Sequence, residues 1–189
     1  MANFTAVFDA CVLYPAPLRD LLMSVAMTDQ FRARWTEEIH DEWTRNLLAN
    51  RADLDAAQLQ RTVELMNMAV PDCLVENYDW MIDSLELPDP NDRHVLAAAI
   101  KSQADVIVTN NLKDFPEEAL SKFDIEAQSP DTFLSHLFDL NPPAFCSAVR
   151  QQRKRLMNPE HTAEELLDTF YNQGLPLTVN KLREVIDLL

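Results

Sequence analysis

Two short apolar runs, each ended abruptly by polar residues, constrain the fold of this chain more than any other feature. One lies in "AVFDACVLYP" at 6–15, where Asp9 interrupts the apolar residues, and the other in "ADVIVTNN" at 104–111, where Thr109 ends them. Near-continuous apolar runs are typical of parallel strands that are covered on both faces. We therefore expect a largely buried strand over residues 4–13 and a second one within 104–111.

Segments with helical periodicity separate these runs from shorter strand candidates. The expected helices cover residues 16–27, 36–48, 54–68, 92–103 and a stretch beginning near 129, and the shorter strands cover 31–35, 72–78 and 124–128. Strands that alternate with helices predict an α/β fold, in which a parallel sheet has helices on both faces.

The pattern changes after the motif "DLNPP", beyond which only helical signals remain. Thr162 and Glu165 have the spacing of a capping box, Gly174 is a helix-terminating glycine, and a last helix is expected from about Thr178. The two expected parts are a main domain, residues 1–138, and an α-helical C-terminal extension, residues 139–189.

The composition excludes several classes of protein. The formal net charge of −15 argues against a protein that coats nucleic acid by neutralising its phosphates, although it suits a basic protein partner. It leaves a nuclease open, because clustered carboxylates can bind cations that reverse the local field. Gly174 is the single glycine of the sequence, so no glycine-rich nucleotide-binding loop is present.

Cysteine usage and hydropathy predict the compartment. The three cysteines are widely spread and lack the spacing of a zinc site, which favours buried thiols in a reducing environment. The N-terminus does not have the pattern of a secretory signal, and the longest apolar runs fall short of the roughly 18 residues of a membrane helix. We expect a cytoplasmic protein without a membrane segment.

Four acidic residues are candidates for one shared site. Asp9 and Asp114 follow expected strands, Glu42 lies on an expected helix, and Asp92 begins another helix. In open α/β sheets, functional residues gather at the carboxyl ends of the strands. Carboxylates packed together repel one another unless a cation holds them ionised, and hard oxygen ligands favour Mg²⁺ or Mn²⁺. The pattern therefore indicates a divalent-metal site.

Each candidate has an ordinary structural alternative. Asp9 can serve as a helix N-cap or turn residue, and Asp114 can cap the segment that follows it. Glu38 lies one turn before Glu42 and is its rival, as Asp89 is the rival of Asp92. The nearby histidine, at position 94, is expected to be a packed or surface residue.

Taken together, these motifs resemble the PIN-domain ribonucleases, and among them the VapC-type toxins of toxin–antitoxin systems. The matching pieces are "VFDACVLYP", "TEEIHDEW" and "DPNDRHVLAAAIKSQADVIVTNNLKDF", and the resemblance covers about residues 4–135. The helical tail also resembles an extension found on a subset of these toxins. The resemblance implies a three-layer α/β/α sandwich with a parallel sheet.

The same resemblance implies a metal-dependent endoribonuclease, the toxin of a type II toxin–antitoxin pair with a basic antitoxin partner. The family's acidic positions fall on Asp9, Glu42, Asp92 and Asp114, which would hold Mg²⁺ or Mn²⁺ and cleave RNA phosphodiester bonds. The family's polar helpers after the strand fall on Thr109 and Asn111.

Two other functions compete with this one. The first is a catalytically inactive PIN-like module that only binds a partner. The second is a haloacid-dehalogenase-type phosphatase, which needs a second aspartate where this chain has Cys11.

Basic residues give a further set of expectations. Arg93, Lys101 and Lys113 are the candidates for contacts to RNA phosphates, whereas the run "RQQRKR" at 150–155 is equally an RNA or partner contact or a solvated helix face. Apolar helix stripes are candidate surfaces for a homodimer or an antitoxin, although such stripes usually belong to the core.

Overall fold

A four-stranded parallel sheet forms the centre of the molecule in the computed structural model, which describes residues 4–157 and 159–189. Its strands are β1 (Thr5–Phe8), β2 (Arg32–Arg34), β3 (Val106–Val108) and β4 (Glu126–Gln128). Their spatial order is β2-β1-β3-β4, and every neighbouring pair is parallel. The predicted parallel α/β fold is confirmed.

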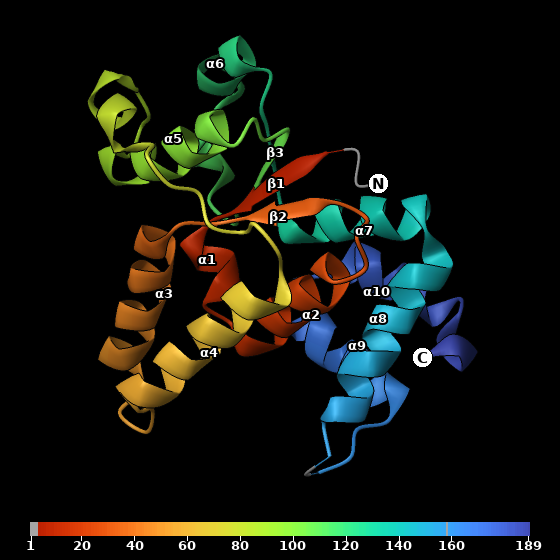
Figure 1. Cartoon of the computed structure of the whole chain (residues 1–189). Helices are drawn as coiled ribbons and strands as arrows, with labels where there is room; N and C mark the ends of the chain where they lie inside the picture. The colour runs from red at the N-terminus through yellow and green to blue at the C-terminus, as the bar shows by residue number, and fades with distance from the viewer. Residues whose placement is uncertain (1–3, 158) are drawn as a thin grey trace.

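Helices surround this sheet and continue beyond it. They are α1 (Ala10–Leu13), α2 (Ala16–Ala26), α3 (Glu37–Asn50), α4 (Ala56–Ala69), α5 (Arg93–Lys101), α6 (Glu117–Leu120), α7 (Pro130–Leu140), α8 (Pro142–Arg155), α9 (Ala163–Asn172) and α10 (Pro176–Arg183). Short 3₁₀ turns cover Asp79–Ser84, Pro90–Asp92, Leu112–Asp114, Ser121–Phe123 and Ile186–Leu188. Figure 1 shows α5 on one side of the sheet and α2 and α7 on the other. No helix of the described residues is both long and apolar enough to cross a membrane.

Two of the expected strands are wrong in extent. The first strand ends at Phe8, because the chain turns at Asp9 and enters α1 instead of continuing to residue 13. The segment 72–78 contributes only a single bridge, between Trp35 and Leu74. Asp72 and Asn77 adopt positive φ values of 55° and 57°, which ends the extended conformation on either side of that bridge.

An aromatic cluster fastens α7 to the sheet. Phe133 of α7 packs edge-on against Phe8 of β1 and Phe31, with ring centroids 6.1 Å and 5.0 Å apart. Buried aromatic pairs of this kind contribute beyond their area alone. Because side chains alternate along a strand, the Phe8 face is the one that α7 covers.

Capping residues in the local sequence set the ends of the C-terminal helices. Thr162 and Glu165 form the predicted capping box at the start of α9, and Gly174 follows the helix with φ at 80°, a conformation that favours glycine. The last long helix begins earlier than expected, since Pro176 occupies its first turn, where a fixed φ suits a helix start.

A buried carboxylate joins the C-terminal extension to α7. Asp131 accepts hydrogen bonds from the backbone N–H groups of Leu177 and Thr178, both at 2.9 Å, and from the Thr178 hydroxyl at 2.9 Å. These N–H groups belong to the first turn of α10. The N–H groups of a first turn have no acceptor within their own helix. A residue 46 positions away therefore caps α10.

We expect Asp131→Ala to lower the free energy of unfolding by about 2 kcal/mol, because it leaves buried N–H groups without an acceptor. The control is Asp139→Ala, which removes an exposed partner of Lys181 between the same two helices and should cost less than about 1 kcal/mol. Urea unfolding of the full chain measures both. Equal losses in the two variants would contradict the anchoring role.

Candidate active site

The carboxyl ends of β1 and β3 lie side by side at the point where the connections between strands reverse direction across the sheet. The chain passes from β1 to β2 on one side and later returns to β3 on the other side of β1. Phe8 pairs with Val108, and the Asp9 N–H donates to the Val108 carbonyl at 3.1 Å. In open α/β sheets such a switch point is the place where ligands bind.

Asp9 is the most buried of the predicted site acids, with a relative exposure of 3%. It stands at the N-cap of α1, yet its side chain does not cap that helix. Instead, Oδ2 of Asp9 accepts hydrogen bonds from the Thr109 hydroxyl at 2.7 Å and from the Cys11 thiol at 3.0 Å. Burial, followed by the charge of Asp9, raises the pKa of the Cys11 thiol to about 12, so the thiol keeps the proton that it donates.

The loop after β3 folds over the same two partners of Asp9. The Asn111 N–H donates to the Thr109 hydroxyl at 2.9 Å, and the Asn110 N–H donates to Cys11 Sγ at 3.2 Å. Thr109 itself is fully buried, whereas the Asn111 side chain is exposed. Asn111 therefore acts on this arrangement through its backbone.

Glu42 comes to the site on α3, which starts directly after β2. The Thr36 side chain caps this helix by accepting from the Ile39 N–H. Glu38 and Glu42 are four residues apart and therefore share one face of α3. Their common neighbour is buried His94, whose Nε2 lies 3.5 Å from Glu42 Oε2 and whose Nδ1 lies 3.7 Å from Glu38 Oε2.

These neighbours determine the ionisation of His94. Burial lowers its pKa, but the contact with Glu42 and the charge of Glu38 outweigh this effect and raise the pKa above its ordinary value. The Tyr78 hydroxyl donates to Glu38 at 3.1 Å and fixes that carboxylate from the other side.

Asp92 has the most perturbed carboxylate of the group. It stands at the N-cap of α5 without capping the helix through its side chain. Burial, followed by the charges of Asp9, Asp89, Asp114 and Glu42, raises its pKa to about 6. The charges of Asp9, Asp114 and Glu42 therefore act on Asp92, although the four residues come from different parts of the chain.

The rivals of two predicted acids have other partners. Asp89 accepts from the Asn91 N–H at 2.9 Å and caps the short turn before α5, in keeping with the ordinary role expected for it. Glu38 is bonded to Tyr78 and is not among the charges that raise the pKa of Asp92, whereas Glu42 is. Each rival thus has a hydrogen-bond partner of its own among the described residues.

The donor set fits a hard divalent cation in type. All four predicted ligands are carboxylates, which Mg²⁺ and Mn²⁺ prefer, and their mutual repulsion is the strain that a cation would relieve. Within residues 4–157 and 159–189, however, no three His, Cys, Asp or Glu side chains stand close enough together to hold a metal ion. The carboxylates are of the right chemical type, but in this arrangement of the described residues no three of them are close enough to share one ion.

The basic candidates fall in different regions. Arg93 follows Asp92 directly, and Lys113 precedes Asp114. Lys101 does not lie near the site, because α5 runs back along the sheet and carries it about 12 Å away from Arg93.

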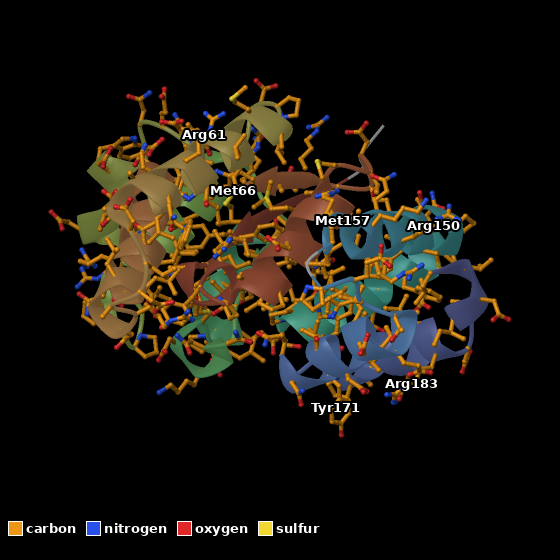
Figure 2. The ribbon with its side chains drawn as sticks, turned by 90° about the horizontal axis from the view of Figure 1, so that it is seen from below. Arg61, Met66, Arg150, Met157, Tyr171 and Arg183 are labelled. Carbon is orange, nitrogen blue, oxygen red and sulfur yellow. The ribbon has the colours of Figure 1, made fainter. Side chains whose placement is uncertain are left out.

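The basic run lies with the C-terminal helices. Figure 2 shows Arg150 and Arg183 on the C-terminal helices, apart from Arg61 and Met66 of α4. Arg153 donates to the carbonyls of His161 and Leu189, so part of the run fastens the extension to itself.

Sequence reasoning missed three neighbours of the site acids. The sequence predicts His94 to be a packed or surface histidine. It uses Cys11 only as evidence against a phosphatase, and it gives no role to Tyr78. For His94 a signal existed, since it lies two residues after Asp92 within the same helical turn. Tyr78 lies 40 residues from its partner Glu38, a separation that leaves no local trace.

The fold and the site define the class of this protein. It is a small α/β protein with acidic side chains at the switch point of a parallel sheet. Comparison with known proteins gives the family. The PIN domain profile matches residues 5–113, and the VapC50 C-terminal domain profile matches residues 130–184. The chain belongs to the PIN-domain family, with a C-terminal part of the VapC50 type, as its motifs predicted.

One curated relative is the "Putative ribonuclease VapC50" of Mycobacterium tuberculosis, which is 43% identical over 82 residues. The match covers 43% of this chain and 48% of the relative, so the chain spans about half the length of the curated relative it matches. No solved structure matches the chain significantly.

We expect Asp92→Asn to raise the Tm of the metal-free protein at pH 7.5. A carboxylate whose folded pKa is about 6 binds a proton more tightly when folded than when unfolded, so its contribution to stability is lost as the pH rises through 6. The gain of the variant should therefore shrink towards zero near pH 4. Thermal unfolding in EDTA measures it, with exposed Asp83→Asn as the control. A pH-independent gain would contradict this origin.

Proposed function

We propose that this chain is a metal-dependent endoribonuclease and the toxin of a type II toxin–antitoxin pair. The observation that carries the proposal is the half-buried carboxylate of Asp92 near other acids: burial, followed by the charges of Asp9, Asp89, Asp114 and Glu42, raises its pKa to about 6. Strongly perturbed acids at a switch point are candidates for catalysis or cation binding. Membership of the PIN-domain family and the similarity to a relative named as a putative ribonuclease support the same function.

The proposed ligands of Mg²⁺ or Mn²⁺ are Asp9, Glu42, Asp92 and Asp114. A bound divalent cation supplies Lewis acidity towards a water nucleophile and the phosphate oxygens. The four carboxylates provide the hard oxygen donors that such an ion requires.

The chain's own contribution is to hold these groups in place before RNA arrives. Asp9 cannot rotate freely, since Thr109 and Cys11 both donate to its Oδ2. Within the described residues, Oδ1 of Asp9 accepts no side-chain or backbone hydrogen bond, and we assign this oxygen to the cation. Asn111 fixes Thr109 through its backbone N–H. Such fixed orientation lowers the reorganisation needed for reaction.

Partners follow from charge and from the family. A formal charge of −15 suits a basic antitoxin, and Arg93 and Lys113 are the proposed contacts for RNA phosphates. We further propose a cytoplasmic location, the division into residues 1–138 and 139–189, and a homodimer as a candidate assembly.

We expect Asp9→Asn to abolish Mg²⁺- or Mn²⁺-dependent RNA cleavage while the fold is retained. The amide keeps an oxygen that accepts from Thr109, but it loses the charge that a cation requires. The measurement is an RNA-cleavage assay on purified protein freed of any antitoxin, with circular dichroism to verify folding.

The matched control for this variant is Asp105→Asn. Asp105 directly precedes β3, at the end of the strand opposite to the site, and also accepts a hydrogen bond, from the Thr5 N–H at 2.8 Å. Cleavage by a folded Asp9→Asn protein at the wild-type rate would refute the assignment. A wild-type protein whose Tm does not rise with Mn²⁺ would favour the inactive binding module.

We expect Lys113→Gln to weaken RNA binding and to flatten its dependence on salt, whereas Lys154→Gln should change neither. One lost phosphate contact should reduce the slope of log K against log salt by about 0.7 for single-stranded RNA. Fluorescence anisotropy on an uncleavable RNA measures both variants. An equal effect of Lys154→Gln would instead place RNA on the C-terminal basic run.

A further inference from the structure

His94 joins the two helices that carry proposed metal ligands. It belongs to the first turn of α5, two residues after Asp92, and its ring reaches the acidic face of α3. Its exposure is only 5%, so the ring has little room to reorient. A buried, polar side chain of this kind needs partners to offset its desolvation.

The ring contacts two carboxylates that would otherwise repel each other. Glu38 and Glu42 carry like charges at i and i+4 on α3, an arrangement that destabilises a helix. His94 lies against both, with Nε2 facing Glu42 at 3.5 Å and Nδ1 facing Glu38 at 3.7 Å. The buried ring therefore contacts both acids and restricts where each can point.

The contacts continue outward from this ring. The Tyr78 hydroxyl holds Glu38 at 3.1 Å, so Tyr78, Glu38, His94 and Glu42 form one connected row. The two ring nitrogens differ, since Nδ1 is buried without a hydrogen bond in the described structure and Nε2 has the shorter contact. The side of the ring that faces Glu42 is thus the one expected to orient a proposed ligand.

We propose that His94 is a positioning residue that orients Glu42 towards Asp9 and Asp92 and thereby sets the affinity of the site for a divalent cation. This inference rests on the proposed function. Because α5 carries both Asp92 and His94, the same rigid turn places one proposed ligand and aims another. Partners that orient ligating groups typically change metal affinity or activity about 10- to 100-fold when removed.

A pair of substitutions separates the two sides of the ring. His94→Gln places an amide donor near the position of Nε2, opposite Glu42, whereas His94→Asn places one near Nδ1, opposite Glu38. Both keep a polar side chain at the buried site. We expect Mn²⁺ affinity to fall about 10- to 100-fold in His94→Ala and His94→Asn, and to recover to within a few-fold of wild type in His94→Gln.

The measurement is a calorimetric titration of the metal-free full chain with Mn²⁺, without RNA. His40→Gln is the matched control, because His40 lies on the same α3 but faces Trp43 and Asn67. We expect it to lower Tm without changing the Mn²⁺ affinity. In cleavage assays, the His94→Asn variant should need more Mn²⁺ for half-maximal rate while the KM for RNA stays unchanged.

The outcomes distinguish this inference from the function on which it rests. Wild-type Mn²⁺ affinity in His94→Asn, or equal losses in His94→Asn, His94→Gln and His40→Gln, would overturn the positioning role alone. A wild-type chain that neither binds Mn²⁺ nor cleaves RNA would overturn the proposed function and the positioning role with it.

Discussion

The hydrogen bond between Thr109 and Asp9 is the contact on which the site depends. It joins residues 100 positions apart at the adjoining ends of β1 and β3, and it buries a carboxylate that water would otherwise stabilise. Such burial is unfavourable unless the charge is matched by donors. Thr109 and Cys11 supply those donors, and the loop after β3 holds both of them in turn. The register of the sheet thus fixes the orientation of Asp9.

Repulsion is the opposing constraint. Burial, together with the charges of Asp9, Asp89, Asp114 and Glu42, raises the pKa of Asp92, which is an arrangement that selection for stability alone would remove. The fold tolerates it because rigid supports surround the site: the buried aromatic cluster at β1, the capped start of α3, and the row that runs from Tyr78 through His94. Local destabilisation of this kind is common where a protein must bind a ligand.

Much of the fold and of the proposed site could be predicted from local sequence. Alternating strand and helix signals predicted the parallel sheet, and Thr162 with Glu165 identified the start of α9, because a cap needs only its own turn. The strand over 4–13 was predicted too long, since apolar residues after Asp9 suit a buried helix as well as a strand. The prediction of a strand over 72–78 was wrong in extent. Asp72 and Asn77 have positive φ values, so the extended segment between them is too short to pair beyond a single bridge.

Local sequence established which residue types were available and at which element ends they stand: Asp9 after a strand, Asp92 before a helix, and Glu42 one turn after Glu38. These are local properties, fixed by periodicity and spacing. Contacts between residues far apart in the chain depend instead on the tertiary structure. Tyr78 engages Glu38, and His94 reaches across from α5 to α3. No local pattern encodes such contacts, since they exist only once packing has brought the helices together.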